Sequence, residues 1–345
     1  MRLKIVNIGA FLALFLCICL FSPTLARDGG DRQGSLRSWR DGATKEVIVD
    51  FIETVCDRDN PAFVPEEERI AVFDNDGTLW CEKPVYPQFV FCRDQLREAA
   101  AKNPGLEEDS LVKAALDGDF KTLAGSGAKG ILHLIGLSRP EGDLGAYEED
   151  VDRWIRVTKH PRFKRLYTEC AYKPMLELLE YLKNKGFKTY IVSGGGRDFM
   201  RAFAQRVYGI APEKVVGSSS HLEYREKDGV PAIVKKSDIA FLNDGAGKPV
   251  GIQSVIGRRP ILAFGNSDGD FEMLKWTASG KHKHLCLLVH HTDAEREYAY
   301  DRDSAVGKLD RALSEAGARG FVVVDMKRDW LEVFADDAGG DAGEQ

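Results

Sequence analysis

A run of four apolar residues stops at a pair of acidic residues, and this junction constrains the fold more than any other feature of the chain. The run is Ile70-Ala71-Val72-Phe73, and Asp74-Asn75-Asp76-Gly77 follows it. A short and uniformly apolar strand is typical of a parallel sheet that is covered on both faces, and a polar loop follows its carboxyl end. The junction therefore predicts a buried strand with Asp74 and Asp76 at its carboxyl end.

Strands and helices alternate in the second half of the chain, from about residue 172 onward. A helix that starts at Pro174 and ends at Gly186 precedes an apolar strand at 189–192, which Ser193-Gly194-Gly195-Gly196 terminates. The same patterns predict strands at 214–217, 260–264, 284–289 and 321–324, helices at 199–207, 249–257, 271–278 and 304–317, and a hairpin around Asp228-Gly229. This alternation predicts an α/β fold built on a doubly wound parallel sheet.

One long segment interrupts the alternation. Residues 82–168 carry apolar side chains such as Leu96, Leu111 and Trp154 but have little strand character. We therefore expect a helical cap inserted between two core segments, 43–81 and 169–334, the first of which begins with an amphipathic helix at 43–56. The polar, glycine-rich residues 27–42 are expected to form a flexible leader, and the acidic residues 335–345 a disordered tail.

The first 26 residues have the pattern of an export signal. Arg2 and Lys4 precede a run of 14 apolar residues and glycine, from Ile8 to Phe21, and Thr24-Leu25-Ala26 provides a small-x-small cleavage site. A membrane span usually needs about 18 or more apolar residues, so a cleaved signal is favoured over a retained anchor. This predicts an exported protein, periplasmic or secreted, with no stable membrane insertion after cleavage.

The charge of the chain argues against a nucleic-acid partner. The formal net charge is −6, and loss of the first 26 residues would remove two basic residues and no acidic one. Proteins that bind nucleic acids need a clustered basic face to neutralise phosphates, so this negative net charge disfavours such a function.

Five cysteines remain after the signal: Cys56, Cys81, Cys92, Cys170 and Cys286. Their spacing contains neither a C-x-x-C pair nor a zinc pattern. We expect mostly buried thiols, with a disulfide between Cys81 and Cys92 as the alternative that an oxidising compartment would permit.

The two acidic residues after the first strand suggest a cation site. Asp74 and Asp76 lie two residues apart around a turn, so both carboxyl groups can face one point, where their repulsion requires a cation or a proton. Mg²⁺ suits such a pair because it binds one or two carboxylates together with phosphate and water. Taken alone, the same residues also fit a simple polar turn in which Gly77 supplies the bend.

Four segments together resemble the signatures of the haloacid dehalogenase-like phosphohydrolases, in the style of the phosphoserine-phosphatase-like branch. The first is Val72-Phe73-Asp74-Asn75-Asp76-Gly77-Thr78-Leu79, and the second is Ser193 after Tyr190-Ile191-Val192. The third is Lys248, and the fourth is Gly265-Asn266-Ser267-Asp268-Gly269-Asp270 after Ile261-Leu262-Ala263-Phe264. The first signature is specific, while the second and third gain their weight from their order and spacing.

This resemblance implies Mg²⁺-dependent hydrolysis of a small phosphate ester through an aspartyl-phosphate. Asp74 would be the nucleophile and Asp76 the general acid and then the general base. Ser193 and Gly194 would hold phosphoryl oxygens, and Lys248 would neutralise charge. The implied metal ligands are Asp74, the backbone carbonyl of Asp76, and side chains of the fourth signature, Asn266 and Asp270.

The chain departs from the family pattern at one position. Asn266 stands where the family usually has an acidic metal ligand, so one negative charge is missing unless Asp268 or Asp270 contributes. The assignment of the lysine also has alternatives, because Lys235 and Lys236 precede Ser237-Asp238. We favour Lys248 because Pro249 begins a helix that leads toward the strand of the fourth signature.

Three other functions fit parts of the sequence. Gly265-Asn266-Ser267-Asp268-Gly269 matches the G-x-S-x-G pattern of serine esterases, with Ser267 as nucleophile, but no histidine lies well downstream of it. The neutral Asn266 also fits an exported protein that binds a phosphate ligand without turnover. Gly125-Ser126-Gly127-Ala128-Lys129-Gly130 matches a dinucleotide-binding pattern, but no strand precedes it, and we expect a flexible connector there.

Overall fold

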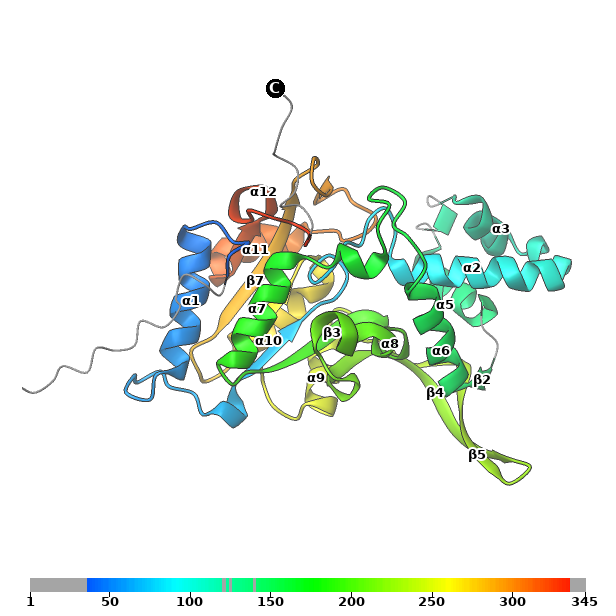
Figure 1. Ribbon diagram of the computed structural model, residues 1–345, viewed down its shortest axis with the longest axis horizontal. Coiled ribbons are helices and arrows are strands. Elements are labelled where there is room, and N and C mark those ends of the chain that lie inside the picture. The colour runs from blue at the N-terminus through cyan, green and yellow to red at the C-terminus, as the bar shows by residue number, and fades with distance from the viewer. Residues whose placement is uncertain (1–35, 120–121, 124–125, 139–140, 336–345) are drawn as a thin grey trace, which may run out of the picture. The chain divides into compact units, whose positions relative to one another are not determined.

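The computed structural model describes residues 36–119, 122–123, 126–138 and 141–335 (Figure 1). Within these ranges a nine-stranded sheet has the order β2-β5-β4-β3-β1-β6-β7-β8, and β9 pairs with β7. The strands are β1 (Ile70–Phe73), β2 (Gly142–Asp143), β3 (Lys188–Gly196), β4 (Val215–Lys227), β5 (Val230–Phe241), β6 (Leu262–Gly265), β7 (Leu285–Thr292), β8 (Ala299–Tyr300) and β9 (Val322–Asp325). The α-helices are α1 (Ala43–Cys56), α2 (Pro87–Lys102), α3 (Ser110–Asp117), α5 (Gly127–Ser138), α6 (Leu144–Ile155), α7 (Lys173–Asn184), α8 (Arg197–Tyr208), α9 (Gly247–Val255), α10 (Phe271–Ala278), α11 (Arg311–Arg319) and α12 (Met326–Asp329).

The strand β1 lies inside the sheet, parallel to β3 on one side and to β6 on the other. All four of its residues are buried, as the uniformly apolar sequence requires. Strands β4 and β7 continue the parallel arrangement outward, and β9 follows β7. The predicted α/β fold with a parallel sheet is therefore confirmed.

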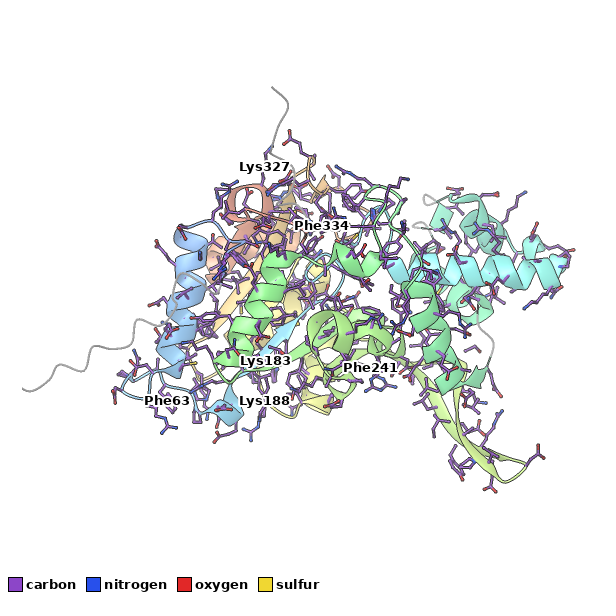
Figure 2. All side chains as sticks on the ribbon, viewed as in Figure 1. Phe63, Lys183, Lys188, Phe241, Lys327 and Phe334 are labelled. Carbon is purple, nitrogen blue, oxygen red and sulfur yellow. The ribbon has the colours of Figure 1, made fainter. Side chains whose placement is uncertain are left out.

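Helices cover both faces of the sheet, and the side chains of β1 alternate between them. Phe73 belongs to an apolar cluster that includes residues of α1, α7 and α8, such as Phe51 and Leu178. Val72 belongs to a second cluster, with residues of α9, α10 and α11 such as Ile252. Side chains fill the space between the sheet and the helices (Figure 2). Because the faces are covered, the loops at the carboxyl ends of the strands are the accessible part of the parallel sheet.

The strand β4 serves two parts of the sheet. Val216 pairs with Val192 of β3 in the parallel part, whereas residues 219–227 pair antiparallel with β5. The long hairpin turns at Asp228 and Gly229, both with positive φ, 55° and 75°, as the Asp-Gly pair predicts. The two-residue strand β2 pairs with the outer edge of β5.

The segment between β1 and β3 is mostly helical, as its apolar spacing predicts. Helices α2, α3 and α5 share a small apolar cluster of their own, which includes Leu96, Val112, Ala115 and Leu134. The predicted flexible connector at 125–130 is wrong for residues 127–130, since α5 begins at Gly127. The division of the chain into cap and core remains a prediction.

Two other local expectations differ from the structure. The leader does not extend to residue 42, because Leu36 and Trp39 are each only 1% exposed and Trp39 packs edge-on against Trp330, with 5.9 Å between ring centroids. The helix expected at 304–317 begins at Arg311, because the Asp268 carboxylate accepts hydrogen bonds from the backbone amides of Asp310 (3.1 Å) and Ala312 (2.9 Å) at its start.

The predicted signal at 1–26, the leader at 27–35 and the tail at 336–345 lie outside the described residues. Phe334, labelled in Figure 2, is buried close to the end of the described chain. No helix in the described ranges has the length and apolar character needed to cross a bilayer. The cysteines of this part, Cys56, Cys81, Cys92, Cys170 and Cys286, are free thiols, and all but Cys56 are buried.

Candidate active site

Three neighbouring strands bring the predicted site residues to one edge of the sheet. Asp74 directly follows β1, Ser193 lies near the end of β3, and Asn266 directly follows β6. The backbone amide of Asp74 donates to the carbonyl of Phe264 over 2.9 Å, which fixes the first loop against the fourth-signature strand. The order of the strands thus explains why residues separated by more than a hundred positions share one site.

Lys248 reaches Asp74 from helix α9. Its Nζ donates to Asp74 Oδ1 (2.6 Å), to Asp270 Oδ1 (2.5 Å) and to the Val192 carbonyl (3.0 Å). The Lys248 side chain is only 2% exposed. The structure therefore brings Lys248 to the first signature, whereas Lys235 and Lys236 lie on β5 and bond to other groups.

Burial and charge set the protonation of this cluster. Burial alone would lower the pKa of Lys248, but the carboxylates of Asp270 and Asp74 outweigh it and raise that pKa above its usual value. Burial and the Asp270 charge raise the pKa of Asp74, against the opposing effect of Lys248. Lys248 is therefore a fixed cation at the base of the site, shared by two carboxylates.

Asp76 has an environment suited to proton transfer. Burial raises its pKa to about 6, although the hydrogen bond from Trp80 opposes the rise. The Trp80 indole Nε1 donates to Asp76 Oδ1 over 2.8 Å, which leaves Oδ2 directed elsewhere. A Cβ added at Gly195 would lie 3.6 Å from Asp76 Oδ2 and 3.3 Å from Ser193 Oγ, so both oxygens approach the bare face of this glycine. A carboxyl group with a pKa near neutrality can both give and accept a proton at physiological pH.

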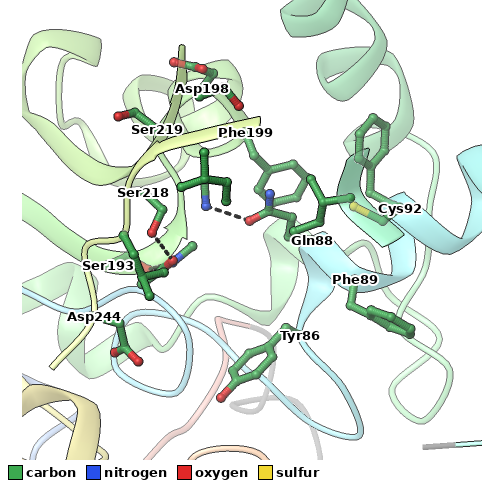
Figure 3. A pocket seen from close by; sticks show the side chains of 18 of the residues that line it. Tyr86, Gln88, Phe89, Cys92, Ser193, Asp198, Phe199, Ser218, Ser219 and Asp244 are labelled. Atoms are coloured by element: carbon green, nitrogen blue, oxygen red, sulfur yellow. Dashed lines mark hydrogen bonds between the residues drawn. The ribbon is translucent and has the colours of Figure 1, made fainter. Parts of the chain in front are cut away.

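The glycine run after Ser193 is held by three side chains that no sequence motif marks. Ser218 Oγ donates to the Gly194 carbonyl (2.7 Å), and Asn243 Nδ2 donates to the Ser193 carbonyl (2.9 Å). Gln88 of α2 accepts from the Gly196 amide over 2.7 Å (Figure 3). The run is thus held by Ser218 and Asn243 at its start and by α2 at its end.

Asn266 is buried, and each end of its amide has one hydrogen-bond partner, which leaves a second lone pair on Oδ1. Its Oδ1 accepts from Thr78 Oγ1 (3.0 Å), and its Nδ2 donates to Glu82 Oε1 (2.8 Å). Glu82 also accepts from the Tyr300 hydroxyl over 2.7 Å, and burial raises its pKa to about 8. Glu82 could not be predicted from the sequence, since a single glutamate in a loop carries no periodic or motif signal.

Asp270 does not have the surroundings expected of a metal ligand. One oxygen accepts from Lys248, and the other accepts from the backbone amides of Asn266 (3.0 Å) and Ser267 (3.1 Å) and from Ser267 Oγ (3.2 Å). Because both oxygens already have protein donors, the structure makes Asp270 a partner of Lys248 and of the fourth-signature loop.

The serine-esterase alternative is not supported by the contacts of Ser267. Its hydroxyl bonds to Asp270 and accepts from the Gly269 amide (3.2 Å). In the described part of the chain no histidine is hydrogen-bonded to Ser267, so the base of a catalytic triad is missing there.

The donors of this site fit a hard divalent cation. The described residues contain no preformed cluster of three His, Cys, Asp or Glu ligands. The carboxyl groups of Asp74 and Asp270 nevertheless share the ammonium of Lys248, and the charges of Asp74 and Asp76 act on the nearby carboxyl group of Glu82. Mg²⁺ needs few protein ligands, prefers oxygen donors and is stabilised by such an excess of negative charge.

A pocket of about 360 Å³ opens above this cluster. Asp74, Asp76, Ser193 and Lys248 line its base, and its walls come from α2, α5, α6, α8 and the β4–β5 hairpin. In Figure 3, Ser193, Ser218 and Asp244 lie on one side of the pocket and Phe89 and Cys92 on the other. The volume suits a small molecule.

Comparison with known proteins gives one family match and similar folds. The family model described as haloacid dehalogenase-like hydrolase matches residues 71–275. A conserved protein of unknown function from Anaerococcus prevotii has a solved structure with a TM-score of 0.52 and 16% identity, covering 82% of this chain and 91% of that one. A protein of unknown function from Bordetella pertussis has a TM-score of 0.46 and 16% identity, covering 75% of this chain and 99% of that one. Among curated proteins, none is similar enough in sequence to count as a relative. At this identity the first structure supports the fold alone.

Proposed function

The chain belongs to the haloacid dehalogenase-like hydrolases, and we propose that it hydrolyses small phosphate monoesters through a covalent intermediate on Asp74. The observation that carries the proposal is the contact of Lys248 Nζ with Asp74 Oδ1, 2.6 Å long, at the base of a pocket that Asp76 also lines. A nucleophile, a fixed cation and a carboxyl group that can exchange protons are the groups that this reaction needs.

In the first step, an oxygen of the Asp74 carboxylate attacks phosphorus. Because Oδ1 accepts from Lys248, Oδ2 is the oxygen left for attack. The bond from phosphorus to the ester oxygen breaks, and the leaving alcohol takes the proton of Asp76. The product on the enzyme is an aspartyl-phosphate, and Asp76 is left as a carboxylate.

In the second step, Asp76 acts as the base. It takes a proton from water while the water oxygen attacks phosphorus, and the bond between phosphorus and Asp74 breaks. Inorganic phosphate leaves, and both carboxyl groups return to their starting states. The bond from Trp80 holds the Asp76 side chain through both steps.

Three groups would hold the phosphoryl oxygens. The Ser193 hydroxyl and the backbone near Gly194 supply donors, and Lys248 supplies a positive charge. Mg²⁺, held by Asp74, the Asp76 carbonyl and Asn266, would offset the negative charge of the phosphoryl group when bound. The helices between β1 and β3 bring Gln88 and Phe89 to the pocket, and we propose that they form the cap.

The neutral Asn266 supports a second candidate, a binder of phosphate ligands without turnover. One negative charge fewer weakens the hold on a cation, and a weakly held cation slows the chemistry before it weakens ligand binding. The export signal predicted at residues 1–26 would put either function outside the cytoplasm.

The deciding experiment measures phosphate release from p-nitrophenyl phosphate with Mg²⁺ and with a chelator. We expect turnover with Mg²⁺, loss with chelator, and a phosphorylated Asp74 when the reaction is quenched in acid and mapped by mass spectrometry. Label on another residue would contradict the mechanism. Tight binding of phosphate esters without any turnover would favour the binder.

A further inference from the structure

We propose that the end of the pocket away from Asp74 binds an anionic group on the leaving alcohol, with Lys235 as the residue that determines this specificity. The inference rests on the proposed function, since it names the class of phosphate ester that the same site would hydrolyse. The substrate would be a phosphate monoester whose alcohol carries a carboxylate or a second phosphate.

Lys235 is an inward-facing ammonium with few protein partners. It lies on β5, lines the pocket and has a side chain that is 18% exposed. Its Nζ donates to Ser220 Oγ, and it lies 5.3 Å from the centre of the Tyr147 ring. The nearest carboxylate oxygen with which it pairs in the described structure, Asp198 Oδ2, is 3.9 Å away, too far for a hydrogen bond.

Asp198 cannot neutralise Lys235, because it is shared. Its Oδ1 accepts from Arg197 Nε over 3.1 Å and lies 4.0 Å from Arg201 Nη1. Glu148 and Glu213 are the other carboxyl groups in this cluster, and the charges of both act on Arg201. Three cations therefore share three carboxyl groups, and none of these carboxyl groups is hydrogen-bonded to Lys235 in the described structure.

Burial strengthens the interaction between Lys235 and an anionic ligand. Burial lowers the pKa of Lys235, and the charge of Asp198 offsets only part of this effect. An anion that enters the pocket would restore the missing partner in a poorly solvated place, where charge-assisted hydrogen bonds are strong.

The adjacent residue, Lys236, provides a matched comparison. It also lines the pocket, but its Nζ already donates to Glu141 Oε2 (2.5 Å) and lies 2.8 Å from Glu223 Oε2. With two carboxylates close by, it has no excess charge to offer. Strand β5 thus carries one lysine that is paired closely with carboxylates, Lys236, and one that is not, Lys235.

The walls between the two ends of the pocket are largely apolar. They include Phe89, Ile135, Phe199 and Leu242. Such walls favour an alcohol with a short apolar stretch between its phosphate and its second anionic group. A neutral polyol would leave these side chains without apolar contacts and Lys235 without a partner.

The test compares ω-phosphooxy carboxylic acids of two to six carbons with their primary amides. For the unaltered protein we expect kcat/KM to favour the acid over its amide by about tenfold or more at one or more chain lengths. Lys235→Met should bring that ratio to about one, Lys235→Arg should preserve much of it, and Lys236→Met should leave it as in the unaltered protein. The corresponding bisphosphates distinguish whether a phosphate serves better than a carboxylate.

The inference is overturned if no acid is preferred at any length, or if the preference survives in Lys235→Met. Should the protein lack turnover altogether, the proposed function fails, but the inference is still tested by calorimetry. The same acids and amides would be titrated into the Asp74→Asn protein with and without Lys235→Met, and equal affinities for acid and amide would refute it.

Discussion

The amide of Asn266 donates to the carboxylate of Glu82 over 2.8 Å, so the acidic group that position 266 lacks is found one side chain away. Glu82 lines the same pocket as Asp74 and Asp76. The fourth signature has a neutral residue at position 266, but Glu82 provides a third carboxyl group at this end of the site. This arrangement leads to the first prediction.

Above pH 8, where Glu82 is ionised, Glu82→Gln should weaken Mg²⁺ binding by about tenfold, because it removes a negative charge while keeping an acceptor for Asn266. Isothermal titration of Mg²⁺ measures the effect without substrate. The matched variant is the charge exchange Glu82→Gln with Asn266→Asp, which should regain most of the affinity. If the single variant binds Mg²⁺ as tightly as the original protein, Glu82 does not contribute charge to the site.

Asp74→Asn should reduce turnover at least about a thousandfold, since an amide oxygen is a poor nucleophile toward phosphorus. Circular dichroism and the thermal midpoint should show a folded protein, because the amide can still accept from Lys248. A folded variant with normal rates would eliminate Asp74 as the nucleophile.

The pH profile should depend on Asp76. Its pKa of about 6 lies above the usual value, and the protonated form is needed for the leaving alcohol, so kcat/KM should fall as pH rises past about 6. The bond from Trp80 lowers that pKa, and Trp80→Phe should therefore shift the descending limb to higher pH. A limb that moves to lower pH, or does not move, would contradict the assignment.

Two glycines should respond differently to alanine. At Gly195 the new methyl group would lie 3.3 Å from Ser193 Oγ, close but tolerable, inside the space where phosphate is expected. Gly195→Ala should lower kcat/KM more than about tenfold with little change in thermal midpoint. At Gly77, φ is +74° and the methyl group would lie 2.1 Å from Asn266 Nδ2, so Gly77→Ala should lose about 1 to 3 kcal/mol of stability. Kinetics and urea unfolding of both variants separate the effects.

Trp39→Ala should lower the free energy of unfolding by about 3 to 5 kcal/mol, as expected for a buried indole. Trp39 is 1% exposed, and its Nε1 donates to the Pro174 carbonyl over 2.9 Å. Urea denaturation gives the value, with Arg40→Ala as an exposed neighbour for comparison. A change below 1 kcal/mol would mean that residues 36–42 are not part of the folded core.

The sequence was most informative where a strand ends in a polar loop. The apolar run before Asp74 and the order of Ser193, Lys248 and Asn266 along the chain were enough to predict one shared sheet edge. The roles of Asp270 and Glu82 were not accessible in this way. Spacing places Asp270 close to Asn266, but it does not tell whether its carboxylate faces a cation or a lysine.

Tertiary packing explains the other differences. Glu82 meets Asn266 because the loop after β1 packs against β8, where Tyr300 donates to the same oxygen, and neither contact has a local sequence pattern. Residues 27–42 are mostly polar, so their composition did not indicate that Trp39 is buried. Its partner Trp330 lies almost three hundred residues away in the sequence. Long-range contacts of this kind decide burial regardless of local composition.

The continuity of β4 gives the pocket a fixed length. Ser218 bonds to the phosphate end at Gly194, and Leu222, four residues further along the same strand, pairs with Lys235. At the rise of an extended strand these residues are at most about 13 Å apart, and the antiparallel pairing of residues 219–222 with β5 resists a change in that span. The strand therefore sets the distance between the two ends of the pocket, and this distance would select leaving groups by their length as well as by their charge.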